Sequence, residues 1–375
     1  MLLLLLACTD KPLNGYIVVV SGRVVDETGA GIGGAIVTLG TDAGDTGSAI
    51  VAETQADPDG NWSTPVYGTA LDGNVLRAVY SAPGRSQTLA RYTLNLRTPT
   101  VARLDPGPWQ TWESSDRTLP AMELPAEGAS GHAGVRVVTL LGAALPGATV
   151  TLRRGWGAPA ADPVEDIVTT SADGGFGLDE LPGWWTATVD PGETWGEARF
   201  GIFLDPSTPA TVVGVVPTLD ANWLTAALTW DAAPADLDLH LINPQKGTNG
   251  TADYHVWSGD PRHPETTSAP AEAQLLLADS DGTGPESLIV VAAPDVGETR
   301  LDAFDNSDAT DVAASQLGLC HAQMQVWLDG QDPTYYTVSP GEIATLWHPV
   351  EVDDSVPYEV ESYSLGALAD DATAF

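Results

Sequence analysis

Two short motifs in the C-terminal half of the chain carry the residues best suited to chemistry. In Asp236–Leu241 the leucines alternate with polar residues, so a strand would project two carboxylates and an imidazole from one face, with the carboxylates roughly 7 Å apart. The second motif, Asp279–Glu286, is an acidic turn that contains glycine and proline. The five carboxylates of the two motifs belong to Asp236, Asp238, Asp279, Asp281 and Glu286.

This set of carboxylates is open to three interpretations. Calcium takes about six to eight oxygen ligands, which the strand and the turn could supply together, although the turn lacks the EF-hand spacing. Two carboxylates on one face also suit the acid and base chemistry of a glycosidase. The third interpretation is a solvated acidic face with capped turns. No cofactor is certain from the sequence, and calcium is the one that these ligands would suit.

Other catalytic signatures are absent from the sequence. It contains no G-x-S-x-G elbow, H-E-x-x-H motif, phosphate loop or dinucleotide-binding glycine motif. Cys320 and His321 could form a nucleophile–base pair or two metal ligands. Neighbours in a strand point to opposite faces, however, which favours a buried structural thiol. His240, His255 and His263 could meet after folding. We therefore expect no catalytic residues and no enzyme activity.

The charge of the chain limits its partners. The formal net charge is −36, and the two lysines are Lys11 and Lys246. A surface this acidic repels phosphate backbones, so we exclude nucleic acid as a partner. The same acidity attracts cations and keeps an exported protein soluble.

The N-terminus resembles a targeting signal. Leu5-Leu-Ala-Cys8 is similar to the lipobox of bacterial lipoproteins, and polar residues follow Cys8 at once. The apolar segment Leu2–Ala7 is shorter than a usual signal core, so residues 1–8 are interpreted as a signal peptide whose true start could lie upstream. The resemblance implies that Cys8 is lipidated and anchors the chain in the cell envelope, at the outer membrane or cell surface. No later apolar run approaches the length of a membrane span.

An internal repeat occupies the N-terminal half. Residues 22–39 align without a gap with residues 135–152, and ten of the eighteen aligned positions are identical. An acidic, glycine-containing turn follows each copy, at 57–61 and at 173–175. Short strands rich in β-branched residues, separated by turns and without helical periodicity, indicate antiparallel β-sandwiches. The two predicted modules span residues 16–126 and 132–219.

The repeated motifs resemble those of the carboxypeptidase regulatory-like domain, a transthyretin-type β-sandwich. The matching segments are Gly22–Val24, Gly33–Leu39 and Asp57–Trp62 in the first copy, and Val135–Val137, Pro146–Leu152 and Ala172–Phe176 in the second. Gly33 and Val135 depart from the family pattern, which has proline and glycine at these positions. The resemblance implies a structural or presenting role, because such modules carry no catalytic residues of their own.

A third β-rich unit follows from about Asp220. Leu224–Trp230 alternates, with apolar residues on one face, as expected for a half-buried strand. The order L-T-W, D-L-D-L-H and D-x-D-G-T-G-P-E resembles a family of bacterial extracytoplasmic β-sandwich domains without an assigned enzyme activity. We therefore predict an all-β chain of tandem antiparallel sandwiches. Two transthyretin- or Ig-like modules precede a third sandwich at 220–352, and an acidic tail follows at 353–375.

These observations favour a non-enzymatic, surface-anchored bacterial lipoprotein that acts as a structural or binding protein of the cell envelope. Its expected partners are the membrane, through the lipid on Cys8, and a polysaccharide or envelope protein. One alternative is a calcium-dependent carbohydrate-binding accessory module, in which Trp109, Trp112 or the Trp184-Trp185 pair would stack on sugars. In small sandwiches, however, such residues more often fill the core. A second alternative is a hydrolase with its site in the third domain.

Overall fold

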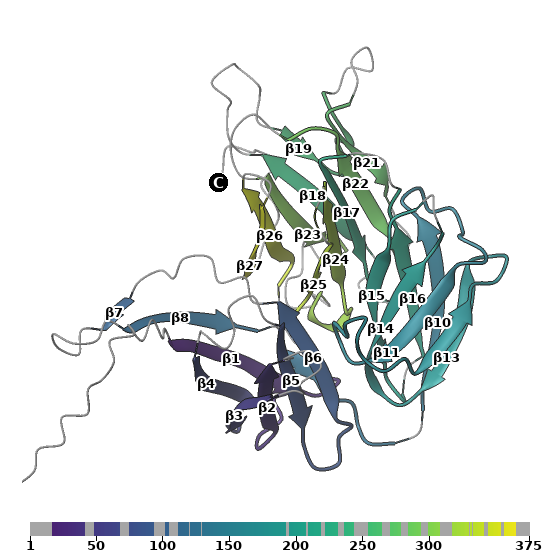
Figure 1. Ribbon diagram of the computed structural model, residues 1–375. Helices are drawn as coiled ribbons and strands as arrows, with labels where there is room; N and C mark the ends of the chain where they lie inside the picture. The colour runs from purple at the N-terminus through teal and green to yellow at the C-terminus, as the bar shows by residue number, and fades with distance from the viewer. Residues whose placement is uncertain are drawn as a thin grey trace, which may run out of the picture.

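The computed structural model confirms the predicted all-β class (Figure 1). It describes residues 17–41, 49–67, 75–93, 102–104, 112–119, 121–128, 130–192, 195–207, 209–218, 222–231, 236–243, 254–264, 271–278, 284–293, 299–307, 317–329, 331, 333–340, 344–353 and 356–364. The predicted signal segment with Cys8 lies outside these residues. No helix in the described part of the chain has the length and hydropathy needed to cross a bilayer.

The first module is a sandwich of two sheets, ordered β4-β1-β8-β7, with β9 also paired to β1, and β3-β2-β5-β6. Its strands are β1 (Ile17–Val25), β2 (Ile36–Thr41), β3 (Ala49–Gln55), β4 (Asn61–Tyr67), β5 (Val75–Ser81), β6 (Thr88–Thr93), β7 (Ala102–Leu104), β8 (Trp112–Thr118) and β9 (Met122–Glu123). β-Branched and aromatic residues recur along β1, β2 and β5, and these strands contribute Val18, Leu39 and Tyr80 to a shared core.

The second module has sheets ordered β13-β10-β16 and β12-β11-β14-β15. Its strands are β10 (Gly131–Thr139), β11 (Thr149–Arg154), β12 (Asp166–Thr169), β13 (Gly175–Glu180), β14 (Gly183–Asp190), β15 (Ala198–Leu204) and β16 (Ala210–Val216). β10 shows the alternation of a half-buried strand, with Ala133, Val135 and Val137 inward and Arg136 exposed.

The two modules share strand pairing and turn geometry. β1 pairs antiparallel with β4 and parallel with β8, and β10 pairs in the same way with β13 and β16. The amide of Val24 donates to Gly60 O at 2.9 Å, and the amide of Val137 donates to Gly174 O at 2.9 Å. Gly60 and Gly174 have φ of 81° and 79°, a conformation that glycine adopts without strain. The sequence repeat is therefore a structural repeat.

The third domain is a larger sandwich, with sheets ordered β20-β21-β22-β17-β24-β25 and β19-β18-β23-β26-β27. Its elements are β17 (Leu224–Thr229), β18 (Leu237–Asn243), β19 (Tyr254–Val256), β20 (Arg262–His263), β21 (Ala273–Leu277), β22 (Glu286–Val290), β23 (Thr299–Asp305), the 3-10 turn η4 (Leu317–Leu319), β24 (Gln323–Leu328), β25 (Thr334–Thr337), β26 (Leu346–Asp353) and β27 (Val356–Ser364). β27 lies within the segment 353–375 that we assigned to an acidic tail. It pairs antiparallel with β26, so part of this segment extends the sheet.

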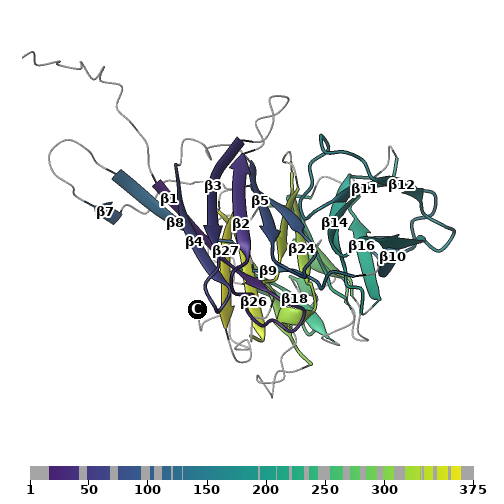
Figure 2. The same ribbon diagram turned by 90° about the horizontal axis from the view of Figure 1, so that it is seen from below.

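The three sandwiches contact one another directly (Figures 1 and 2). Trp156 of the second module exchanges backbone hydrogen bonds with β6, accepting from Arg91 N at 3.0 Å and donating to Leu89 O at 2.8 Å. The second and third sandwiches share an apolar cluster that contains Val138, Leu140 and Ala227. These contacts cover a sheet edge and sheet faces that isolated sandwiches would expose.

Candidate functional site

The polar face of β18 is the first candidate site. Leu237, Leu239 and Leu241 enter the core of the third domain, and Asp238 and His240 occupy the opposite side of the strand. Both polar residues are only 3% exposed. For Asp238 and His240 the interpretation of this face as a solvated acidic surface is therefore wrong, whereas Asp236 is only half-buried.

His240 and His255 come together on this face. His240 Nδ1 lies 2.7 Å from His255 Nε2, and both rings stack on Trp257 with centroid distances of 5.5 and 5.8 Å. Burial and the neighbouring His255 lower the pKa of His240 to about 3, so its ring is neutral near pH 7. The Nε2 of His263 lies 3.9 Å from the carboxylate of Glu272.

A second set of polar side chains, on β23 and β26, lies beside the polar face of β18 in the same sheet. Asp302 stands opposite His240 in the register of β18 and β23. Its Oδ1 accepts hydrogen bonds from His348 Nδ1 at 2.6 Å and Arg300 Nε at 2.8 Å. His348 Nε2 lies 3.1 Å from Glu351 Oε1. Both ring nitrogens of His348 therefore face carboxylates, which makes it a structural link between strands.

Three buried polar atoms on this face make no hydrogen bond: Asp238 Oδ2, His240 Nε2 and Asp302 Oδ2. The hydroxyl of Ser258 donates to Asp238 Oδ1 at 2.6 Å, so it is not oriented toward a histidine base. In the part of the chain that the structure describes, no group of three or more His, Cys, Asp or Glu side chains is arranged to hold a metal ion. The face therefore resembles neither a catalytic triad nor a complete metal centre.

The predicted calcium ligands are only partly described, because Asp279 and Asp281 lie outside the described residues. The Asp236 carboxylate accepts a hydrogen bond from the side-chain amide of Asn306 at 3.0 Å. Glu286 is fully buried, and its Oε2 accepts a hydrogen bond from the backbone amide of Leu239 at 2.5 Å. This bond holds the Glu286 carboxylate beside β18. Burial raises the pKa of Asp238, although its bond to Ser258 opposes this rise. The calcium site stays a prediction.

A second cluster of titratable groups, centred on His321, lies where the three sandwiches meet. His321 Nδ1 lies 2.6 Å from Asp231 Oδ2 in its own domain, and Nε2 lies 3.2 Å from Glu123 Oε2 of the first module. Its ring stacks on Phe203 of the second module with centroids 4.4 Å apart and meets the edge of Trp184 at 5.6 Å. Burial alone would lower the pKa of His321, but Asp231 and Glu123 outweigh burial and raise the pKa to about 10.

The backbone at this junction is constrained. His321 has φ of 48°, in the left-handed region that residues other than glycine seldom adopt. The preceding Cys320 is fully buried, and its Sγ donates to Leu317 O at 3.0 Å. Cys320 therefore faces the core while His321 faces the junction, as the interpretation of a buried structural thiol predicts. Neither residue has the geometry of a nucleophile–base pair.

The sequence analysis named His321 but not the residues that hold it. Glu123 and Asp231 sit in strand-end segments with no motif, and they meet His321 only through tertiary contacts 198 and 90 residues apart. Trp184 and Trp185 are each 3% exposed, so these two tryptophans fill cores and do not offer a surface to sugars. The side chains of Trp109 and Trp112 lie outside the described residues.

Comparisons with known proteins give only distant likenesses. No family model matches the sequence, and no curated protein matches it either. Among solved structures, the chain is similar to the Bacillus anthracis TIE protein, with 8% identity and a TM-score of 0.21 over 87% of this chain; it spans about half (49%) of that protein. It is also similar to GBS52, the minor pilin of Streptococcus agalactiae, with 11% identity and a TM-score of 0.21 over 55% of this chain and 97% of the pilin. A DUF3823 family protein from Parabacteroides merdae has 12% identity and a TM-score of 0.20, over 57% of this chain and 100% of that protein.

Proposed function

We propose that this chain is a non-enzymatic structural or binding protein of the bacterial cell envelope, anchored through a lipid on Cys8. The observation that carries the proposal is the junction at His321, where side chains of all three sandwiches meet. Trp184 and Phe203 of the second module also belong to the core cluster of the first. Shared cores and buried ion pairs fix modules relative to one another, which suits a rigid body that supports or presents a surface.

The polar clusters around His240 and His321 support the non-enzymatic part of the proposal. Each contains histidines and carboxylates, but their hydrogen bonds run to one another and hold strands together. In His321 both ring nitrogens face carboxylates. In His240 one ring nitrogen faces a second imidazole, and the other, Nε2, has no hydrogen-bond partner but is buried away from solvent. A general base needs a free nitrogen within reach of a nucleophile or water. Anchoring rests on the likeness of residues 5–8 to a lipobox.

Fractionation of a bacterium that expresses the protein with an intact upstream signal tests the proposal. The wild-type protein should partition into detergent, because each buried methylene of a lipid contributes about 0.8 kcal/mol to membrane binding. Cys8→Ala should move to the aqueous fraction, whereas Cys320→Ala, which changes the buried thiol, should partition like the wild type. A Cys8→Ala variant that stays with the membrane would overturn anchoring through this residue.

A second candidate is a calcium-dependent carbohydrate-binding module. The observation that favours it is the buried carboxylate of Asp238, which has one oxygen without a hydrogen-bond partner and a raised pKa. A cation beside this carboxylate would compensate for its burial. The remaining ligands would come from Asp279 and Asp281.

A further inference from the structure

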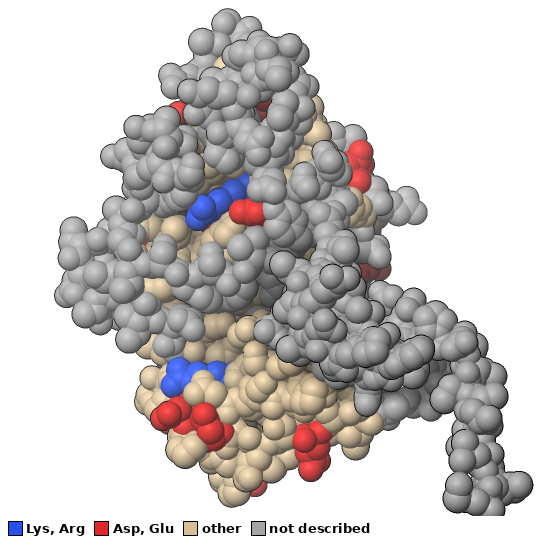
Figure 3. Space-filling model, turned by 90° about the vertical axis from the view of Figure 1, so that its left-hand side faces the viewer, with Lys and Arg blue, Asp and Glu red and all other residues tan. Residues whose placement is uncertain are grey.

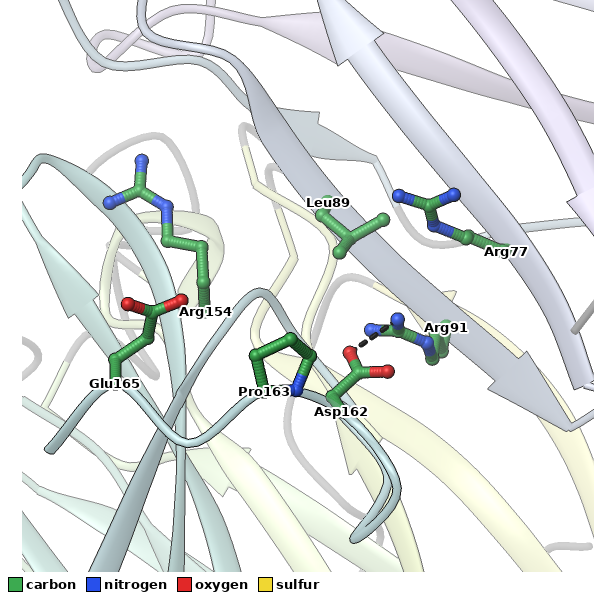
Figure 4. Close-up of a pocket in the computed structure, with 7 residues that line it drawn as sticks. All are labelled: Arg77, Leu89, Arg91, Arg154, Asp162, Pro163 and Glu165. Atoms are coloured by element: carbon green, nitrogen blue, oxygen red, sulfur yellow. Dashed lines mark ion pairs between the residues drawn. The ribbon is translucent and has the colours of Figure 1, made fainter. Parts of the chain in front are cut away.

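A cavity of about 310 Å³ lies between the first and second modules (Figure 4). Its walls come from β5 and β6 on one side and from the end of β11 and the following loop on the other. The lining residues are Arg77, Leu89, Arg91, Arg154, Asp162, Pro163 and Glu165. Three of the 15 basic residues of a chain with net charge −36 thus line one cavity. On the face shown in Figure 3, basic residues likewise form small patches beside acidic ones.

Two of these arginines oppose each other directly. Arg77 and Arg91 are register partners across β5 and β6, and like charges at such positions destabilise a sheet. Arg91 is 7% exposed and forms an ion pair with Asp162 (Figure 4). The Nε of Arg77 is buried and makes no hydrogen bond. A negatively charged group in the cavity would offset the repulsion between the two guanidinium groups.

The other lining residues determine which chemical groups a ligand of this cavity must carry. Arg154 is held by Leu181 O at 2.8 Å and Pro182 O at 2.6 Å, so it supplies charge while its end nitrogens are already bonded. Leu89 and Pro163 add apolar surface. Asp162 and Glu165 are acceptors, which would attract hydroxyl groups and repel a second negative charge.

We propose that this cavity binds a small hydroxylated carboxylate, such as a hexuronic acid. A carboxylate matches the planar donor geometry of a guanidinium. Its hydroxyl groups would donate to Asp162 and Glu165, and its apolar ring face would cover Leu89. The cavity volume of about 310 Å³ is at the lower end of the range of about 300–1,000 Å³ for small-molecule sites, which suits a ligand as small as one sugar acid. The site would bind whether or not Cys8 is lipidated, so it goes beyond the proposed envelope role.

Isothermal titration calorimetry on the full chain, with sodium glucuronate, glucose and inorganic phosphate at constant ionic strength, tests this site. Glucuronate should bind saturably, about tenfold or more tightly than glucose or phosphate. Arg77→Gln should weaken glucuronate binding by about tenfold or more, since it removes the charged donor. The matched control is Arg136→Gln, which makes the same change at an exposed arginine whose Nε donates to Asp173 O.

Circular dichroism and thermal unfolding establish that each variant is folded. If Arg77→Gln does not fold, Arg77→Lys keeps the charge but lacks the planar guanidinium, and it should still lose most of the affinity. No saturable binding of glucuronate to the wild type, tighter binding of phosphate than of glucuronate, or equal weakening by Arg136→Gln would each overturn the proposal.

Discussion

Gly22 and Trp62 face each other across β1 and β4, and the indole fills the space that a side chain at residue 22 would need. A Cβ atom on residue 22 would lie 2.8 Å from Trp62 Cζ2. At the same register of the second module, Val135 faces Phe176. The second module therefore combines a larger strand residue with a smaller ring, which explains why it accommodates Val135 where the first module has Gly22.

This exchange predicts a coupled pair of substitutions. Gly22→Val should lower the free energy of unfolding by about 3 kcal/mol, because the new side chain collides with the indole. Trp62→Phe should cost less, about 1–2 kcal/mol, since the indole Nε1 has no hydrogen-bond partner to lose. The double variant reproduces the Val–Phe pair of the second module. Its loss of unfolding free energy should therefore be smaller, by at least about 1 kcal/mol, than the sum of the losses in the two single variants.

Denaturant unfolding of the four proteins measures this coupling. Gly134→Ala serves as the control, because no atom lies within 4 Å of the added Cβ and its stability should change little. Additive effects of Gly22→Val and Trp62→Phe would contradict the relationship between the two modules.

The repeat and the strand faces were open to prediction because they depend on local patterns. The alternation of Leu237, Leu239 and Leu241 with Asp238 and His240 is a property of the strand itself, and the structure preserves it. Burial of the polar face was not predictable, since it depends on neighbours such as His255 and Phe304 that arrive from other strands. Sequence alternation shows which side chains share a face but not what covers that face.

The junction shows the same limit more strongly. Nothing near Glu123 or Asp231 distinguishes these carboxylates from the other acidic residues of the chain. Their role follows from the packing of three sandwiches around His321, and that packing is set by surfaces far apart in sequence. The arginine cavity likewise combines residues of two modules.

The raised pKa of His321 predicts a pH dependence of stability. Since the folded pKa is about 10 and the unfolded value is 6.5, the protonated ring stabilises the fold fully below about pH 6.5, and this contribution is lost as the pH rises toward 10. His321→Asn tolerates the left-handed backbone but removes the charge, and it should lower the free energy of unfolding at neutral pH by about 3 kcal/mol.

Denaturant unfolding between pH 6 and 9.5 compares the two proteins. Burial also raises the pKa of Cys320, which causes a separate loss of stability above about pH 8.5 in both proteins. The difference between wild type and His321→Asn should therefore shrink as the pH rises. A difference that is constant with pH would show that His321 acts by packing alone.

Calorimetry of the full chain tests the predicted calcium site. If Asp238 and the acidic turn at 279–286 share a cation, calcium should raise the melting temperature, by an amount equivalent to about 2.7 kcal/mol at a hundredfold excess over Kd. EDTA should reverse the rise, and Asp238→Asn should abolish it. Asp205→Asn changes a carboxylate that caps its own turn in the second module and serves as the control. Equal melting temperatures with calcium and with EDTA would contradict the prediction that these residues bind one calcium ion together.

Two glutamines on β24 give the sharpest test of how the second and third sandwiches are held together. The Gln323 side chain accepts from Gly201 N at 2.7 Å and donates to Gly201 O at 2.9 Å, so it satisfies both backbone groups of a residue on β15. Gln325 is 1% exposed, yet neither polar atom of its side chain makes a hydrogen bond. Gln323→Met should lower the free energy of unfolding by about 2–4 kcal/mol, because two buried backbone groups lose their partners.

Gln325→Met should be neutral or stabilising, because it replaces an unpaired buried amide with an apolar side chain of similar length. Denaturant unfolding measures both changes, and limited proteolysis between the second and third sandwiches should accelerate only in Gln323→Met. The opposite order of stabilities would mean that the junction depends on packing around β24 rather than on the paired hydrogen bonds to Gly201.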